Sequence, residues 1–272
     1  MRKKDSLYAG TAKTDITPET GIVHDRLHIR TLVLDVDGNR IAFIAVDLGS
    51  YFNQELLGVA KERFGIDHVL TSGSHTHSSY IDRNPDSPAG ERLLETAIAG
   101  LKEAVENKFS ARIAAGSQRF PQISYNRLIP REDGRNRGMW VGDDHHLPLN
   151  PDRIPYGPVE REVGVIKIED LDGNARAILM NFPCHSDVVA KNFEVSADFP
   201  GVACRKVEET FKDAVCLFVQ GGAGNIAPLY ISPRRKDAND LFKADYTQIE
   251  KMGTILANAT LKLARSPGRW KR

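Results

Sequence analysis

The sequence predicts a single α/β domain, covering residues 1–272, with a mixed β-sheet that includes two β-hairpins and is flanked by helices. Two pairs of apolar, β-rich runs are each joined by a turn that ends in Asp-Gly-Asn, which is typical of hairpins. Elsewhere, short apolar runs alternate with segments of helical periodicity, as in α/β proteins. No linker divides the chain, and 272 residues are enough to bury one large core.

The first half of the chain alternates between strands and helices after its hairpin. A helix over 54–65 is expected to stop at Gly65, because glycine readily takes the conformation that ends helices. A helix over 89–109 has the clearest apolar face, with apolar positions three and four residues apart. The elements expected here are the hairpin 28–50, the helix 54–65, the strand 67–74 and the helix 89–109.

The second half shows the same kinds of element after a long segment without periodicity, residues 119–160, which is expected to be a functional or disordered loop. The second Asp-Gly-Asn turn suggests either an internal duplication or the repeated use of a good turn sequence, and the latter is preferred. The elements expected here are the strand 111–120, the hairpin 163–187, the helix from Asp198, the strand 214–225 and the helix 245–264.

Composition and charge narrow the classes of partner. With 37 basic and 36 acidic residues the net charge is +1, so no nucleic-acid partner is expected, and the basic tail 266–272 is interpreted as a solvated end. No apolar run approaches the roughly 20 residues of a membrane span. An odd number of cysteines, three, and no apolar leader segment favour a cytoplasmic protein without disulfides. A small-molecule partner is expected, and a homo-oligomer is left open.

Four predicted strands end in polar residues, and ligands gather beyond the carboxyl ends of strands in α/β sheets. His75 and His77 project to the same face if their segment is extended. Histidine is a common zinc ligand, and a catalytic zinc ion usually has three protein ligands and a water whose pKa falls from 15.7 to about 7. The residues expected to line one cleft are Asp47, His75, His77, His185 and Asn225.

Each candidate has a structural alternative. A histidine at a strand end often only makes a structural hydrogen bond. For His75 and His77 the spacing alone favours neither this role nor a metal or catalytic one. Asp198 precedes Phe-Pro at a helix start, where capping is the favoured role and a site role the alternative. Arg127 either clamps a substrate carboxylate or carbonyl or is solvated, and the sequence alone favours the solvated role. His145 and His146 lie in the long loop as lid candidates, and serines near the histidines raise a less favoured nucleophile hypothesis.

Ordered motifs across most of the chain resemble the neutral/alkaline ceramidase family, specifically the front part of its N-terminal catalytic domain. The matching stretches are "GTAKTDITP", "VDLG", "SHTHS", "NRLIP", "EVGVIKIED", "NFPCH", "SADFPG" and "VQGGAGNIAP". The resemblance implies cleavage of an N-acyl amide and a zinc ion held by His75 and His185, with a glutamate and a tyrosine from a later part of a longer chain. It also implies that His77 orients the site or contacts substrate, that Arg127 faces the amide, and that zinc-bound water attacks the carbonyl.

Two residues depart from the family pattern. Asn225 stands where the family has an aspartate, and Ala227 stands where it has a serine that contributes to activity. The remaining ligands are expected from Asp47, Asp198, His77 or water.

The sequence thus leads to a zinc-dependent hydrolase of an amide or ester bond in a small soluble molecule. One rival is a non-catalytic domain that binds a metal, ligand or partner, which Ala227 favours. A TIM-barrel amidohydrolase, in which a His-x-His pair follows the first strand, is disfavoured by the hairpins.

Overall fold

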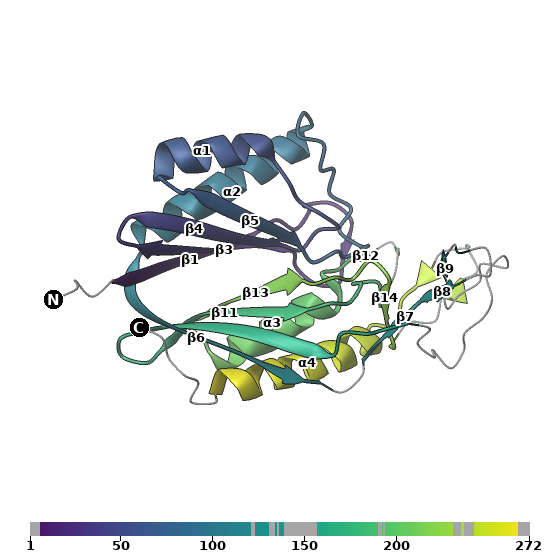
Figure 1. The fold of residues 1–272 in the computed structure, drawn as a ribbon. Helices are drawn as coiled ribbons and strands as arrows, with labels where there is room; N and C mark the ends of the chain where they lie inside the picture. The colour runs from purple at the N-terminus through teal and green to yellow at the C-terminus, as the bar shows by residue number, and fades with distance from the viewer. Residues whose placement is uncertain are drawn as a thin grey trace.

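The computed structural model describes residues 6–120, 123–130, 134, 136–138, 157–189, 192, 194–230, 235–236 and 242–265. Four layers are stacked in it: two helices, one half of a β-sheet, the other half, and two more helices (Figure 1). The helices are α1 (Gln54–Phe64), α2 (Pro88–Glu106), α3 (Asp198–Thr210) and α4 (Thr247–Arg265).

One mixed sheet supplies both inner layers, in the order β13-β11-β10-β6-β1-β3-β4-β5. The two halves are joined where β1 pairs with β6 through two residue pairs, Tyr8 with Ser110 and Ala9 with Phe109. Beyond that seam the sheet folds over, so that β13 contacts β3, β4 and β5. The strands are β1 (Leu7–Asp15), β3 (His28–Val36), β4 (Asn39–Val46), β5 (His68–Gly73), β6 (Phe109–Arg119), β10 (Glu162–Asp170), β11 (Ala175–Phe182) and β13 (Val215–Gln220).

The chain passes through the same topology twice. A first strand pairs with a hairpin, a helix leads to a strand parallel to the hairpin's second strand, and another helix follows. The order β1-β3-β4-α1-β5-α2 thus corresponds to β6-β10-β11-α3-β13-α4. The two Asp-Gly turns occupy equivalent places, with positive φ at Gly38 (89°) and Gly173 (93°). From the sequence, two independent uses of a good turn sequence were preferred over an internal duplication, and that interpretation missed the repeated topology.

Three apolar cores hold the layers together. One lies between α1, α2 and the β3–β4 hairpin, and one lies between α3, α4 and the strands β10, β11 and β13. The third fills the space between the two half-sheets. Both faces of the central strands are therefore buried: in β3, Val33 faces the helices whereas Leu32 faces the other half-sheet. The buried residues of the third core are Ala9, Leu32, Ala45, Ala111, Ile168, Ala177, Leu179 and Leu217.

The predicted fold class is confirmed, because both hairpins form within a mixed sheet that helices flank. A TIM barrel is ruled out, since its eight strands would all be parallel. α1 ends at Gly65, whose φ is 59°, as expected. The first strand of the sheet, Leu7–Asp15, was not predicted. None of the helices that the structure describes is long and apolar enough to span a membrane.

Several short strands lie outside the main sheet. β7 and β14 come from the described parts of two loops, and three of the short strands fall within 119–160, which was predicted to be aperiodic. His145, His146 and the tail 266–272 lie outside the described residues. The short strands are β2 (Ile22–Val23), β7 (Ser124–Asn126), β8 (Leu128–Pro130), β9 (Asn136–Gly138), β12 (Glu194–Val195), β14 (Ile226–Pro228), β15 (Arg235–Lys236) and β16 (Phe242–Lys243).

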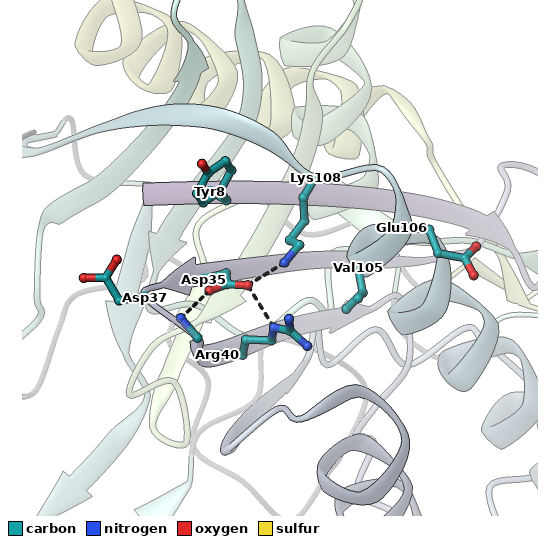
Figure 2. A pocket seen from close by; sticks show the side chains of 8 residues that line it. Tyr8, Asp35, Asp37, Arg40, Val105, Glu106 and Lys108 are labelled. Carbon is teal, nitrogen blue, oxygen red and sulfur yellow. Dashed lines mark hydrogen bonds and ion pairs between the residues drawn. The ribbon is translucent and has the colours of Figure 1, made fainter. Parts of the chain in front are cut away.

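A shallow pocket of about 460 Å³ lies at the hairpin-turn end of β3 and β4 (Figure 2). At its centre the Asp35 carboxylate pairs with Lys108 and, at 2.9 Å, with Arg40. Burial opposes ionisation of Asp35, but the hydrogen bonds from the two cations outweigh it and lower the pKa to about 2. The charged side chains that line this pocket are paired with one another, and Lys108 and Arg40 link neighbouring elements of the fold through Asp35.

Candidate metal centre

Two pairs of parallel strands bring the predicted strand ends to one edge of the molecule. β4 runs parallel to β5, and β11 runs parallel to β13. After β5 the chain turns sharply, and the backbone N–H of His75 donates to Leu48 O at 2.9 Å. His75 itself has a φ of 67°, a left-handed conformation that costs free energy in a residue other than glycine. Such strain persists only where the surroundings hold it.

Three histidines converge at this edge. Among the residues that the structure describes, His75, His77 and His185 form the one group of three or more potential metal ligands, with their ligand atoms all within 4.8 Å of one another. The Nε2 atoms of His75 and His185 lie 3.2 Å apart. His185 comes from the end of β11, so the group joins the two halves of the repeated topology.

Hydrogen bonds at the outer nitrogens decide which ring atoms face the centre. His75 Nδ1 lies 2.7 Å from Gly49 O, and His185 Nδ1 lies 2.7 Å from Ala223 O. A carbonyl oxygen only accepts, so both Nδ1 atoms carry a proton, and in the neutral form of the two imidazoles both Nε2 atoms present a lone pair. His77 Nδ1 lies 3.6 Å from a carboxylate oxygen of Asp187. Tying the outer nitrogen of a histidine to a carbonyl or carboxylate is usual at metal sites.

The lone pairs of His75 and His185 therefore face each other at 3.2 Å, an arrangement that a cation between them would stabilise. Two nitrogens bound to one zinc ion at 2.0–2.1 Å with tetrahedral angles lie about 3.3 Å apart. Burial, followed by the charge of Arg127, lowers the pKa of His185 to about 4, which keeps its imidazole in the neutral form that binds metals. The donor set and its spacing thus fit a zinc ion.

Arg127 lies against the same group. Its Nη2 is 3.3 Å from His185 Nε2 and donates to Gly224 O at 3.0 Å. A guanidinium only donates, which supports the assignment of a lone pair to His185 Nε2. Arg127 is 8% exposed, and its backbone N–H donates to Asn225 O. Arg127 is therefore not the solvated arginine that the sequence alone favoured, and the backbone oxygen of Asn225 helps to hold it in place.

Asp47 lies outside the histidine group, contrary to the expectation that it is a ligand. Its buried carboxylate accepts from Arg30 Nη1 at 2.7 Å and from the backbone N–H of His28 at 2.9 Å. Burial alone would raise the pKa of Asp47, but the charge of Arg30 lowers it. The ion pair between Asp47 and Arg30 could have been inferred from the sequence. A hairpin turn at Asp37-Gly38 sets a register in which Asp47 lies opposite His28, and Arg30 is two residues further along the same strand as His28.

Asp198 lies outside the histidine group and binds the start of its own helix. Ala197 is the N-cap residue, whereas Asp198 is the first residue of α3, with a φ of 57°. Its buried carboxylate accepts from the backbone N–H of Phe199 at 2.6 Å, and from those of Val188 and Val189 at 3.0 and 3.2 Å. Asp198 thus satisfies one N–H of the first helical turn, as a cap would, and also holds the loop that follows His185.

The hydroxyl groups around His75 and His77 have a role that the sequence did not indicate. Thr76 Oγ1 donates to Ser196 O at 2.7 Å, and Ser78 Oγ accepts from Asn192 at 3.1 Å. Ser186 Oγ, one of the nucleophile candidates, donates to Ser74 O at 2.6 Å. These side chains tie the His75–His77 segment to loops of the second half of the chain.

Comparisons with known proteins agree with the motifs. Two curated proteins of Dictyostelium discoideum are similar: neutral ceramidase A, 25% identical over 248 residues, and neutral ceramidase B, 24% identical over 244 residues. Each alignment covers 80% of this chain and 33% of the relative, so the chain spans about a third of the length of the curated relatives it matches. No family model matches.

Solved structures show the same fold. The neutral ceramidase from Pseudomonas aeruginosa superposes with a TM-score of 0.74 at 19% identity, covering 98% of this chain and 46% of that one. A structure described as ceramidase complexed with C2 gives a TM-score of 0.74 at 19% identity, over 97% of this chain and 45% of that one. Most of this chain is thus similar in sequence to one region of the neutral ceramidases and shares the fold of that region.

Proposed function

We propose that this chain carries a zinc-dependent hydrolase site that cleaves an amide bond, or an ester, in a small soluble substrate. The observation that carries the proposal is the convergence of His75 Nε2 and His185 Nε2, 3.2 Å apart and each on a ring whose Nδ1 is bound to a carbonyl oxygen, with His77 beside them. With both imidazoles neutral, the two Nε2 lone pairs repel each other unless a cation lies between them. The similarity to ceramidases supports the choice of an acyl–nitrogen bond.

His75, His77 and His185 would hold the metal ion. When bound, zinc supplies a Lewis acid for a carbonyl oxygen and lowers the pKa of water from 15.7 to about 7. Hydrolysis adds water to the acyl carbon, breaks the C–N bond and transfers a proton to the leaving amine.

Arg127 is the residue of this chain best placed to contact the substrate. Its guanidinium is held by Gly224 O beside His185 and presents fixed N–H donors toward the histidine group. Donors of this kind stabilise the negative charge that develops on the acyl oxygen when a carbonyl is attacked. Partial burial also strengthens such an interaction, since little water competes for it.

One observation favours the rival function, a domain that binds a metal without catalysis. Ala227, which lies where the resemblance expects a serine, is buried and paired with Tyr125 in the β7–β14 ladder. A methyl group there supplies no hydroxyl to a substrate. Metal binding without turnover of any acyl substrate would support this rival.

The first experiment is elemental analysis of protein purified without added metal, comparing wild type with His75→Ala, His185→Ala and the control His68→Ala. His68 is exposed on β5. We expect near-stoichiometric zinc in wild type and in His68→Ala, and loss of zinc from the other two variants. A wild type that holds no zinc and takes up none at micromolar concentration would overturn the proposal.

Turnover is tested next with N-acyl substrates that run from acetyl amides of soluble amines to long-chain ceramide. Cleavage of short, soluble members supports the proposed substrate class. Cleavage of ceramide without cleavage of any soluble amide would show that the substrate is a lipid instead.

A further inference from the structure

We propose that Gln220 is a positioning residue that sets the separation of His75 and His185 by binding the residue before each of them. The inference rests on the proposed function, since it concerns the same metal centre. Gln220 is the last residue of β13 and comes from neither histidine loop. Gln220 opens the polar end of a strand within the stretch "VQGGAGNIAP", but the sequence assigns it no role.

The Gln220 side chain makes three hydrogen bonds, all of them to the two loops. Its amide nitrogen donates to Cys184 O at 2.8 Å and to Ser74 O at 3.2 Å, and its amide oxygen accepts from Cys184 N at 3.3 Å. Ser74 precedes His75, and Cys184 precedes His185. A single planar amide group therefore spans the boundary between the two halves of the fold.

The backbone of Gln220 reinforces the same connection. Its N–H donates to Ser72 Oγ, at 3.0 Å, across from β13 to the end of β5. The peptide between Ser74 and His75 is thus held from the second half of the chain at its carbonyl, where Ser186 Oγ also donates at 2.6 Å. Ser74 and Cys184 are buried, so these bonds are shielded from competing water.

The strained backbone of His75 shows why such a connection is needed. A residue with a φ of 67° relaxes toward negative φ unless its flanking peptides are held, and relaxation would turn the imidazole away from His185. Leu48 O holds the N–H of His75 from within its own half. Gln220 and Ser186 hold the preceding carbonyl from the other half, where His185 resides. The Nε2–Nε2 distance thus depends on Gln220.

The test measures metal affinity in the full-length chain with the Gln220→Met variant, which keeps side-chain length and removes the amide. Gln118→Met is the matched control, because Gln118 is also half-buried and its amide donates to a backbone carbonyl, Ala259 O at 3.0 Å, away from the histidines. Zn²⁺ dissociation constants come from competition with a chelator, and the absorption spectrum of bound Co²⁺ reports ligand geometry. Thermal unfolding without metal measures the structural cost of each substitution.

We expect Gln220→Met to weaken Zn²⁺ binding about 10- to 100-fold, the usual effect of losing a residue that orients metal ligands, and to change the Co²⁺ spectrum. Gln118→Met should lower thermal stability without either effect. Wild-type affinity and spectrum in Gln220→Met would overturn the inference while leaving the proposed function intact. A wild type that binds no Zn²⁺ would overturn both.

If Gln220→Met does not fold, Gln220→Asn gives the same information from a smaller change. It keeps an amide at the end of β13 but shortens the side chain by one carbon, which withdraws the amide nitrogen from Ser74 O and Cys184 O. A several-fold weaker Zn²⁺ affinity with a folded chain supports the positioning role of Gln220, because a typical net hydrogen bond has that effect. An unchanged affinity contradicts it.

Discussion

The Nε2 atoms of His75 and His185 lie 3.2 Å apart although 110 residues separate the two histidines in the sequence. The contact crosses from one half of a repeated topology to the other. It depends on a left-handed backbone at His75 and on hydrogen bonds that connect the two halves.

His77→Ala should weaken Zn²⁺ binding more than about a hundredfold, beyond the effect expected for a residue that only orients ligands. The reason is that His77 shares the group with His75 and His185 and has Asp187 at its outer nitrogen. Chelator competition measures the change, with His68→Ala as the control. If affinity stays at the wild-type value and only the Michaelis constant rises, His77 contacts substrate, as the family resemblance implies.

Arg127→Lys should leave Zn²⁺ affinity nearly unchanged and lower kcat/KM for an N-acyl substrate by roughly 10²- to 10³-fold. A lysine keeps the positive charge but lacks the planar fork that now reaches Gly224 O beside His185. Arg63→Lys, on the exposed face of α1, is the control. Equal loss of metal and activity would instead assign Arg127 to the support of the metal site.

The stability contribution of Asp198 should depend on pH between about 4 and 7. Burial raises the pKa of this carboxyl from 3.8 to about 7, although backbone N–H groups partly oppose the shift. In that interval the folded state holds a proton that the unfolded state has released, so stability falls as the pH rises from about 4 to 7, and the contribution is lost above the folded pKa. Asp198→Asn removes the titration. The difference in melting temperature between wild type and variant should therefore change from pH 4 to 7 and level off above it.

The pH at which that difference is half changed tests the raised pKa of Asp198. If the melting temperatures of wild type and Asp198→Asn instead change in parallel with pH across the interval, the three backbone donors around Asp198 outweigh burial and keep the carboxylate ionised.

Gly10→Ala should destabilise the fold by on the order of 3 kcal/mol or more, because a Cβ there would lie 1.8 Å from Ala104 O on α2. Gly58→Ala is the matched control in α1, where a new Cβ meets no atom within 4 Å. Removing glycine from a helix interior should make Gly58→Ala stabilising by about 1 kcal/mol. Denaturant unfolding measures both. A neutral Gly10→Ala would show that β1 and α2 can move apart.

Local patterns were enough to predict most of the fold. The hairpins follow from the Asp-Gly turns, whose glycines have positive φ, and α1 follows from its periodicity and from Gly65. The strand Leu7–Asp15 was missed because its place depends on pairing with β3 and β6, which no local pattern records. The repeated topology was missed for the same reason, since it appears only in the order of the strands.

The candidate site shows the same distinction between features that local sequence predicts and features that depend on contacts between distant residues. His75, His77 and His185 were found from residue type and position at strand ends, and the structure brings them together. Asp47 was assigned to the metal because its nearby partner Arg30 was not considered. The part played by Gln220 could not be predicted, because it depends on where an amide at the end of β13 meets two loops from distant parts of the chain.

The core between the two half-sheets also limits how this chain can be divided. A fragment that ends before β6 would retain β1, β3, β4 and β5 but expose the inner faces of Ala9, Leu32 and Ala45. It would keep His75 and His77 and lack His185. Fragments cut at the seam should therefore aggregate when expressed alone, and the two should recover a metal centre only when they are refolded together.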